Sequence, residues 1–508
     1  MSEEAAPFRW LAQLGFWIGP LLAAVLWFAP QAGYALDAAR PEMNRMAAVA
    51  VWMAVWWLTE AAPLAVTSLL PLVLFPLGQI LPGREVAPIY AQREIFLYLG
   101  GFLVALAVEE SGLHRRVALS IVAAMGDRPR WIVGGVMAAT ALLSMWTSNT
   151  ATAMMILPIA LSVVGHADRA GGDPLRRKRF AAALVLGVSY AATIGGLGTL
   201  IGTPTNIAFR SFYEQTYPDA PPVTFLGWML VATPLAAAML AAAWALLVGW
   251  TFPMGGGPLL GGGSGAREDL RAMGPMTCAE RRVLVIFLIT AGLWIFREPV
   301  AGWGWAPLLG LGVAKSATGG RVEWVDDGTV AMAMAIVCFL FPSGRKPDEK
   351  LLSWTATQRV PWGILFLFGG GLALARGLEV TKLDALLGQQ VAAQLQGLSP
   401  LAMQAVVATG VTYLSELTSN VATVNLVMPI IAPTASDMGL PPLTLLLPAA
   451  MAASCGFMLP VATPPNAIAY STGRVSVGDM VRAGFWLNWI GIALVVLFCR
   501  VLGGWALG

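Results

Sequence analysis

An all-α polytopic membrane protein is the fold class that this sequence predicts, and three observations predict it. Of the 508 residues, 57% are hydrophobic and only 12% are charged, about half the charged share of an ordinary soluble domain. Apolar runs of about 20 residues, the length of a membrane-crossing helix, recur along the whole chain. The runs are continuous rather than alternating, and backbone in lipid must satisfy its own hydrogen bonds, so helices are predicted rather than a barrel.

A Gly-rich linker, 253–280, divides the chain into two halves. Residues 1–86 are expected to form N-terminal spans that serve as a scaffold, near 10–29, 46–60 and 64–81. The first repeat, 87–252, is expected to contain spans at 94–112 and 225–250, a re-entrant hairpin at 131–165 and a broken helix at 180–209. The second repeat, 281–508, is expected to contain spans at 281–296, 329–341, 362–378 and 484–505, a re-entrant hairpin at 401–435 and a broken helix at 442–472.

Basic side chains decide the expected orientation. One threading places the Lys- and Arg-rich loops, such as 176–179, on one side, whereas the loops 211–224, 397–400 and 436–441 contain no Lys or Arg. By the positive-inside rule the basic loops are cytoplasmic. This threading requires both hairpins to enter and leave on the same face, the first from the cytoplasm and the second from outside.

Three motifs recur in the same order in both halves. They are LGGFLVALA (99–107) and FGGGLALA (368–375), TSNTAT (147–152) and TSNVAT (418–423), and GTPTN (202–206) and ATPPN (462–466). Such recurrence indicates an internal repeat. Because one hairpin enters from each side, the repeat must be inverted. Inverted repeats with broken helices at mid-membrane are the architecture of secondary transporters.

The polar residues of these motifs suit the binding of ions. Pro204 and Pro464 lack an N–H and disfavour helix at the preceding residue, so each is expected to unwind the middle of its segment. Helix N-termini then offer free N–H groups to an anion. Unwound carbonyls, together with Ser, Thr and Asn oxygens, suit a small cation such as sodium. A single T-S-N could simply join helices, but its duplication at inverted depth favours a binding site.

The paired S-N-T and S-N-V motifs, and ASCGFMLPVATPPNAI at 453–468, resemble the divalent-anion:sodium symporter family of sodium-coupled di- and tricarboxylate transporters. The resemblance covers nearly the whole chain. It implies a homodimer in which a static scaffold carries a mobile transport domain, an elevator-type transporter. It also implies about eleven transmembrane helices besides the two hairpins, with a cytoplasmic N-terminus and an external C-terminus.

The resemblance also implies site residues. Sodium ligands carry over to two groups: Ser144, Ser148, Asn149 and the Gly198 carbonyl, and Ser415, Ser419, Asn420 and the Ala462 carbonyl. Substrate contacts carry over to Asn149, Thr150, Thr199, Asn420, Val421, Thr463 and Pro464. Val421 departs from the family pattern, because a Thr is more usual at this place in the second motif.

The expected function is therefore a symporter of the inner membrane that imports C4-dicarboxylates, such as succinate, malate or fumarate, with co-transported sodium. Its expected partners are the dicarboxylate, sodium, the lipid bilayer and a second copy of the chain, with no nucleic acid. A sodium-independent dicarboxylate exchanger, and a sulfate or citrate carrier on the same scaffold, stay open as alternatives. An intramembrane enzyme is disfavoured, because the sequence shows neither an activated nucleophile nor a metal cluster.

The substitution Val421→Thr tests the departure from the family pattern. A methyl group cannot hydrogen-bond a carboxylate oxygen, so the two ends of the substrate should meet unequal donors. We expect Val421→Thr to change the ranking of dicarboxylates, citrate and sulfate in competition uptake assays more than it changes sodium dependence. An unchanged ranking would show that the substrate does not reach this side chain.

Overall fold

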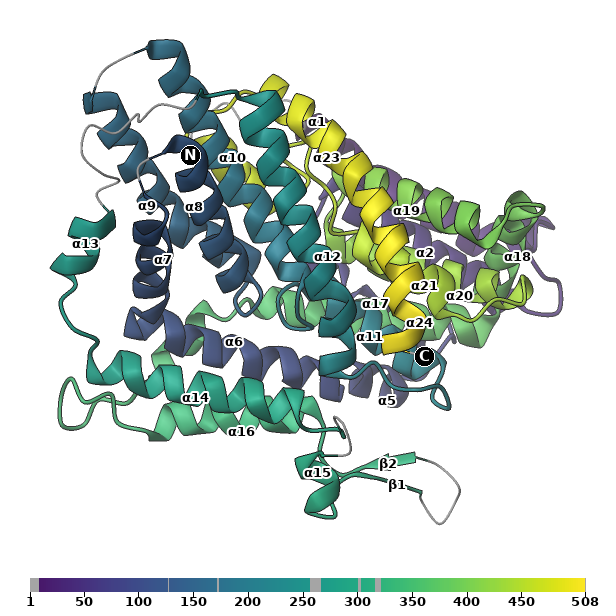
Figure 1. Ribbon diagram of the computed structural model, residues 1–508. Coiled ribbons are helices and arrows are strands. Elements are labelled where there is room, and N and C mark those ends of the chain that lie inside the picture. Colours follow the sequence, from purple (N-terminus) through teal and green to yellow (C-terminus); the bar gives the residue numbers. More distant parts are fainter. Residues whose placement is uncertain are drawn as a thin grey trace. The chain divides into compact units, whose positions relative to one another are not determined.

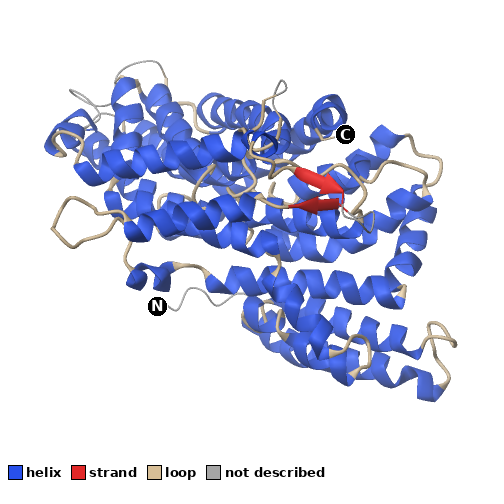
Figure 2. Ribbon diagram, turned by 90° about the horizontal axis from the view of Figure 1, so that it is seen from below, coloured by secondary structure: helices blue, strands red, loops and turns tan. Residues whose placement is uncertain are grey.

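The computed structural model describes residues 9–126, 128–170, 173–255, 266–299, 303–315 and 321–507. Apart from one antiparallel pair of short strands, β1 (Val313–Lys315) and β2 (Arg321–Glu323), its regular elements are helices (Figure 2). The chain forms two compact units. Unit 1 comprises Met1–Ile95, Ala208–Pro218 and Pro361–Ala453, and unit 2 comprises Phe96–Ile207, Asp219–Val360 and Ser454–Gly508.

Unit 1 contains the N-terminal helices and the part of the second repeat from 361 to 453. Its elements are α1 (Arg9–Phe28), α2 (Pro41–Thr59), α3 (Leu64–Thr67), α4 (Leu70–Leu77), α5 (Gly83–Val86), η3 (Ala87–Ala91), α17 (Trp362–Thr381), α18 (Leu383–Leu395), α19 (Pro400–Leu417), α20 (Asn420–Asp437) and α21 (Leu443–Ala452). Other segments of unit 1 pack closely against helix α17, because its consecutive glycines, 369–371, let their atoms approach its backbone. A Cβ at these positions would lie 2.3 Å from Tyr90, 2.5 Å from Ser68 and 2.2 Å from Asn425.

Unit 2 contains most of the first repeat and the C-terminal helices. Its main elements are α6 (Arg93–Ser111), α7 (Leu113–Ala124), α8 (Pro129–Ser144), α9 (Asn149–Ala170), α10 (Pro174–Leu197), α11 (Pro204–Thr216), α12 (Phe225–Ala245), α13 (Ala266–Ala272), α14 (Cys278–Ile295), α15 (Trp305–Leu308), α16 (Asp327–Leu340), α22 (Pro464–Ser471) and α23 (Val477–Phe498). The first residues of α6 and the end of α11 belong to unit 1. Helix α10 is buried on all sides from 180 to 197, as its apolar sequence requires.

The described helices include enough apolar spans for a polytopic membrane protein. Seven helical stretches are long and apolar enough to cross a bilayer: Trp10–Ala32, Gly83–Ser111, Asn149–Arg169, Pro174–Leu197, Phe225–Thr251, Trp362–Thr381 and Val477–Ala506. The pair Leu383–Leu395 and Pro400–Leu417, bent by 118°, would add an eighth. The helical class is confirmed, and the number of about eleven spans stays a prediction.

Each of the four segments expected to form a hairpin or a broken helix is interrupted in the backbone, and the re-entrant character of the hairpins stays a prediction. The segment 131–165 becomes α8 and α9, interrupted at 145–148, and 401–435 becomes α19 and α20, interrupted at 418–419. The segment 180–209 becomes α10 and α11, and 442–472 becomes α21 and α22. Pro204 and Pro464 are the first residues of α11 and α22, where a missing N–H costs nothing. Which face each hairpin enters stays a prediction.

Several elements differ from the sequence prediction. The expected span at 64–81 is divided into α3 and α4, and the expected linker contains α13. The Gly-rich part of that linker, 256–265, lies outside the described residues. The short strands β1 and β2 are an exception to the all-α class. Helices α7 and α18 were not anticipated; they follow the left-handed residues Gly112 (φ 84°) and Lys382 (φ 64°), at corresponding places in the two repeats.

A buried arginine organises the loop that joins α14 to α16. Arg297 is 2% exposed, and its guanidinium contacts Asp327 at 2.7 Å, Glu298 at 3.0 Å and also Glu323. Figure 1 shows α14 and α16 side by side, with α15 and the β1–β2 hairpin at one end of this pair. Arg297 therefore links the start of this loop, at Glu298, to its end, at Glu323 and Asp327.

The substitution Arg297→Met should destabilise the protein strongly. It leaves acidic groups without their buried cation, a loss of about 3–5 kcal/mol for a broken buried pair. Arg376→Met is the matched control, because Arg376 is 51% exposed and pairs with Glu379 on the same helix; we expect less than about 1 kcal/mol there. Thermal melts of both variants in detergent measure the difference, and equal melting temperatures would contradict the structural role of Arg297.

Candidate functional site

The turn between α8 and α9 brings a serine and an asparagine against the broken helix. The Ser144 hydroxyl lies 2.6 Å from the carbonyl oxygen of Ala192 on α10 and 2.8 Å from Oδ1 of Asn149. Turned about its last bond, the Asn149 amide donates instead to Ala192 O (3.1 Å) and Gly202 O (3.2 Å). The amide thus faces a group of oxygens that comes from the hairpin, from α10 and from the unwound linker.

Glycines make this close approach possible. A Cβ on Gly195 would lie 2.3 Å from the carbonyl oxygen of Ala141, and one on Gly196 would lie 2.3 Å from Oδ1 of Asn149. A Cβ on Gly202 would lie 2.5 Å from the carbonyl oxygen of Gly196. Side chains at these positions would push the hairpin off the broken helix, which explains the glycine-rich sequence before Pro204.

Side chains hold the unwound linker 198–203 in place. Nδ2 of Asn206 donates to the carbonyls of Gly196 (3.0 Å) and Thr199 (2.7 Å). The Thr233 hydroxyl on α12 donates to the carbonyl of Gly198 at 2.9 Å. The Thr199 hydroxyl donates to the carbonyl of Met145 in the hairpin turn. Backbone groups that lost their helical partners are therefore satisfied by side chains.

The second hairpin, in unit 1, repeats the wiring of the first. The Ser415 hydroxyl lies 2.8 Å from Oδ1 of Asn420 and 2.5 Å from the carbonyl oxygen of Ala453. Behind each tip two threonine hydroxyls meet: Thr147 with Thr152 at 2.6 Å, and Thr418 with Thr423 at 2.5 Å. Identical contacts in the two halves indicate that the motifs encode one local structure twice.

The second linker, in unit 2, is held like the first. Nδ2 of Asn466 donates to the carbonyls of Gly456 (3.3 Å) and Leu459 (3.0 Å), as Asn206 does in the first repeat. The Thr463 side chain accepts from the backbone N–H of Asn466 and caps α22. The asparagine of each T-P-x-N motif thus closes its own linker.

The structure brings together part of the predicted site. In unit 2, Ser144 and Asn149 meet, the Ser148 hydroxyl accepts from the N–H of Ala151, and Thr150 lies half-buried in the first turn of α9. In unit 1, Ser415 meets Asn420, Ser419 precedes α20, and Val421 is buried. Ala462, Thr463 and Pro464 belong to unit 2, so their grouping with the second hairpin stays a prediction.

Sequence reasoning missed several contributors. The carbonyls of Ala192, Gly202 and Ala453 face the Ser–Asn pairs, and Thr233 bonds the carbonyl of a predicted ligand, Gly198. A backbone carbonyl has no residue-type signature, so no motif could have marked the first three. The duplicated asparagines of T-P-x-N were visible in the repeat, and their recurrence was the available signal for Asn206 and Asn466.

The segments 144–160, 189–209, 415–431 and 454–470 contain no Lys or Arg. Arg210, just beyond the second of them, is 3% exposed and pairs with Glu214 at 2.9 Å. The one formal charge in these segments is the buried Glu416, next to Ser415. The predicted ligands themselves are neutral hydroxyls, amides and carbonyls, and such groups cost less in a membrane than charges would.

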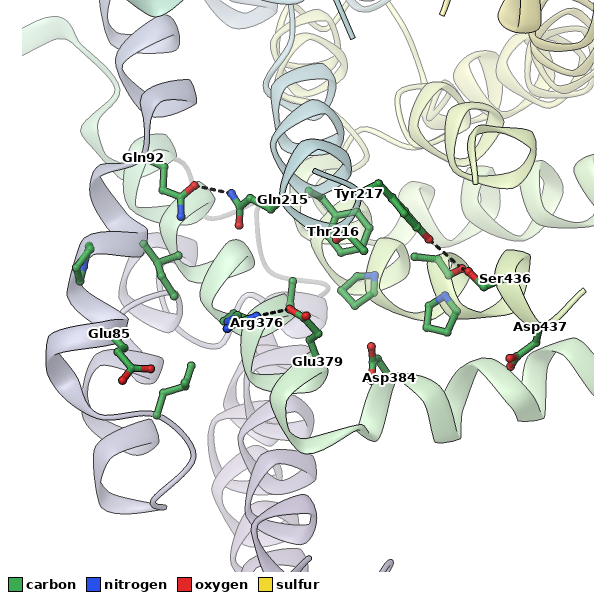
Figure 3. A pocket seen from close by; sticks show the side chains of 18 of the residues that line it. Glu85, Gln92, Gln215, Thr216, Tyr217, Arg376, Glu379, Asp384, Ser436 and Asp437 are labelled. Carbon is green, nitrogen blue, oxygen red and sulfur yellow. Dashed lines mark hydrogen bonds and ion pairs between the residues drawn. The ribbon is translucent and has the colours of Figure 1, made fainter. Parts of the chain in front are cut away.

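A separate cavity of about 740 Å³, lined by both apolar and charged side chains, lies in unit 1 (Figure 3). No predicted site residue lines it, and it borders the C-terminal part of α20 rather than its tip. Burial raises the pKa of Tyr217 in its wall, which keeps the hydroxyl protonated as a donor to the carbonyl of Ala432 (3.3 Å). Its charged side chains disfavour a dianion, because four are acidic and two basic: Glu85, Glu379, Asp384, Asp437, Arg84 and Arg376.

Known proteins resemble this chain over nearly its whole length. A family model described as the sodium:sulfate symporter transmembrane region matches residues 19–507. The chain is 39% identical over 491 residues to the sodium-dependent dicarboxylate transporter SdcS of Staphylococcus saprophyticus, covering 95% of this chain and 90% of that protein. It is 38% identical over 503 residues to SdcS of Staphylococcus aureus strain MRSA252, covering 98% and 92%.

Two solved structures share the fold. The YdaH transporter of Alcanivorax borkumensis aligns with a TM-score of 0.54 at 16% identity, over 83% of this chain and 88% of that one. MtrF of Neisseria gonorrhoeae aligns with a TM-score of 0.57 at 13% identity, over 84% of each chain. At such identities the likeness concerns the fold alone.

The substitution Gly196→Ala tests the contact between hairpin and broken helix. The new Cβ would lie 2.3 Å from Oδ1 of Asn149, so the amide must move away from the oxygen group. We expect the sodium needed to raise the melting temperature to increase about tenfold or more, as for a lost charge-assisted bond. Gly165→Ala on α9, where a Cβ meets nothing within 4 Å, should behave as wild type. Equal sodium responses of the two variants would contradict the assignment.

Proposed function

The chain belongs to the sodium:sulfate symporter family, and on this premise we propose that it carries C4-dicarboxylates across the cytoplasmic membrane together with sodium. The names of its relatives, sodium-dependent dicarboxylate transporters, support this choice of substrate and coupling ion. They also favour a transporter over an intramembrane enzyme. The single observation that carries the proposal is the duplicated Ser–Asn pair, set against backbone carbonyls in each half of the chain.

The Ser144–Asn149 pair is suited to a cation. The Asn149 amide lies within hydrogen-bond distance of the Ser144 hydroxyl and of the carbonyls of Ala192 and Gly202, so neutral oxygens from the hairpin, from α10 and from the linker converge here. Several neutral hard oxygens are the ligands that sodium prefers. We assign the cation sites to Ser144, Ser148, Asn149 and the Gly198 carbonyl, and to Ser415, Ser419, Asn420 and the Ala462 carbonyl.

The substrate should bind where helices begin. Asn149 and Asn420 are the first residues of α9 and α20, and Pro464 is the first residue of α22. Backbone N–H groups in the first turns of α9 and α20 can attract carboxylates. Helix α22 begins with Pro464 and Pro465, which have no N–H. Thr463 caps Asn466, so α22 contributes only its dipole. Each helix end supplies only about half a charge. A unit charge pair at 4 Å is worth roughly 4 kcal/mol at an effective dielectric of 20. Since no Lys or Arg is present in these segments, bound sodium has to supply the positive charge.

The repeat architecture is typical of secondary transporters, and the family resemblance implies an elevator mechanism in a homodimer. We propose that 1–86 belong to a static scaffold and that the hairpins and broken helices move with the bound ions. We place the N-terminus in the cytoplasm and the C-terminus outside, as the family resemblance implies; the distribution of basic loops supports this orientation. Substrate contacts are assigned to Asn149, Thr150, Thr199, Asn420, Val421, Thr463 and Pro464.

Sulfate transport is the second candidate function, and a buried Val421 favours it. This side chain is 6% exposed and removes one hydroxyl from the second motif. A methyl group offers no hydrogen bond to a second carboxylate, so this end of the site does not favour a dicarboxylate over sulfate. Competition of unlabelled sulfate against labelled succinate separates the two candidates.

Uptake of labelled succinate into proteoliposomes should depend steeply on external sodium. We expect lithium to substitute poorly and potassium not at all, because the oxygen groups are small and neutral. The control is counter-flow, in which liposomes preloaded with dicarboxylate are assayed in choline. Equal uptake in choline and in sodium would establish an exchanger instead of a symporter.

Substitutions in the Ser–Asn pairs should separate sodium binding from substrate preference. Ser144→Ala and Ser415→Ala should raise the sodium concentration needed for half-maximal uptake before they alter substrate ranking. Asn149→Ala and Asn420→Ala should abolish uptake while the protein still inserts, since each removes roughly tenfold or more in affinity at a buried site. Ser120→Ala is the control, because that hydroxyl is exposed on α7 and bonds only its own helix. Normal uptake by either Asn variant would reduce the motif to a helix-packing feature.

A further inference from the structure

Two side-chain hydrogen bonds join the two broken helices directly. The Ser189 hydroxyl on α10 donates to Oδ1 of Asn466 at 2.6 Å, and the hydroxyls of Thr205 and Ser454 meet at 2.8 Å. The partners are 277 and 249 residues apart in the sequence, and all of them belong to unit 2. Ser189 is 1% exposed and the other three are fully buried. Water therefore cannot replace a lost partner at either bond.

The first bond connects a turn that serves one ion site with a linker that serves the other. Ser189 lies one turn before Ala192, whose carbonyl accepts from Ser144. Its partner, Asn466, uses its nitrogen to hold the carbonyls of Gly456 and Leu459. That linker contains the carbonyl of Ala462, which the proposed function assigns to the second ion. Ser189 on α10 thus fixes the orientation of the Asn466 amide, and that amide in turn holds the second linker.

The second bond repeats this connection at the other ends of the linkers. Thr205 precedes Asn206, which closes the first linker onto the carbonyls of Gly196 and Thr199. Its partner, Ser454, directly follows Ala453, the residue whose carbonyl accepts from Ser415. Each bond therefore lies within one turn, or one residue, of a carbonyl that faces a Ser–Asn pair.

The first bond is not a by-product of the internal repeat. Relative to the ATPPN motif, Ala449 occupies the place that Ser189 occupies relative to GTPTN. An alanine has no hydroxyl with which to bond Asn206, so the second half lacks a counterpart of this bond. A hydrogen bond that occurs in one half of the chain without a counterpart in the other is specific to these two residues, and is not a feature of helix packing common to both halves.

We propose that Ser189, Thr205, Ser454 and Asn466 are positioning residues that couple the two sodium sites. The inference rests on the proposed function, because it assumes an ion at each Ser–Asn pair. A cation at the first site fixes the turn of α10 that contains Ala192 and Ser189. Ser189 then fixes the Asn466 amide and the second linker, so the second ion meets a linker that is already ordered. Coupling of this kind requires an element that both sites bias, and the Asn466 amide is that element.

Sodium titrations of succinate uptake in proteoliposomes test the coupling. For the wild type we expect a Hill coefficient clearly above one. Ser189→Ala and Thr205→Val should each lower it toward one and raise half-saturating sodium several-fold, while uptake at saturating sodium is largely retained. Ser189→Thr, which keeps a hydroxyl, should recover part of the cooperativity, a result that a purely structural role does not predict.

Thr193→Val is the matched control. Thr193 is fully buried on the same helix, but its hydroxyl bonds only the Ser189 carbonyl within that helix, at 3.4 Å. Its Hill coefficient should stay at the wild-type value. Melting temperatures of all variants in choline show whether the fold is intact, and Thr205→Val tests the second bond independently if Ser189→Ala fails to fold.

The outcomes separate the coupling from the proposed function. If uptake by the wild type does not depend on sodium, the symport proposal itself is wrong. A sodium-dependent wild type with a Hill coefficient of one, or variants whose cooperativity matches that of Thr193→Val, would falsify the coupling while symport stands. Reduced cooperativity in both bridge variants, but not in the control, supports it.

Discussion

Unwound backbone inside an apolar protein must find hydrogen-bond partners, and the rest of this structure depends on that constraint. Each broken helix exposes carbonyls that have lost their helical donors. Leaving one unsatisfied in a buried site costs on the order of 1–3 kcal/mol. Asn206 and Asn466 satisfy these carbonyls in the same way, since each donates from one amide nitrogen to two carbonyls at the break of its own helix. The linkers are therefore rigid loops rather than melted helix.

A rigid linker allows the hairpins to be positioned accurately. The Ser–Asn pair of each tip contacts a carbonyl of the neighbouring broken segment, Ala192 in one half and Ala453 in the other. Glycines on α10 keep the first contact short, because a Cβ at Gly195 or Gly196 would collide with the hairpin. The neutral ligands also explain sodium coupling. A site made of neutral oxygens attracts a dianion only when cations accompany it.

The sequence predicts the broken helices and the hairpin tips well, because proline and duplicated polar motifs leave direct marks. Pro204 and Pro464 begin α11 and α22 as their chemistry requires. Helices α7 and α18 were missed because they are short and interleave apolar residues with Arg or Gln, so hydropathy gives no span there. The strands β1 and β2 lie in the loop between α14 and α16, which Arg297 holds through a tertiary contact that no local pattern encodes.

The absence of titrating groups from the two Ser–Asn pairs and from the asparagines that close the linkers has a consequence for acidity. Hydroxyls, amides and carbonyls keep one protonation state across the physiological range. Acidifying the medium therefore leaves these ligands unchanged and alters the cargo instead, by adding a proton to the acid. The pH profile of this carrier should follow the ionisation of whichever acid is supplied and shift when one acid replaces another. Uptake measured as a function of pH therefore shows which ionic form of the transported acid the protein accepts.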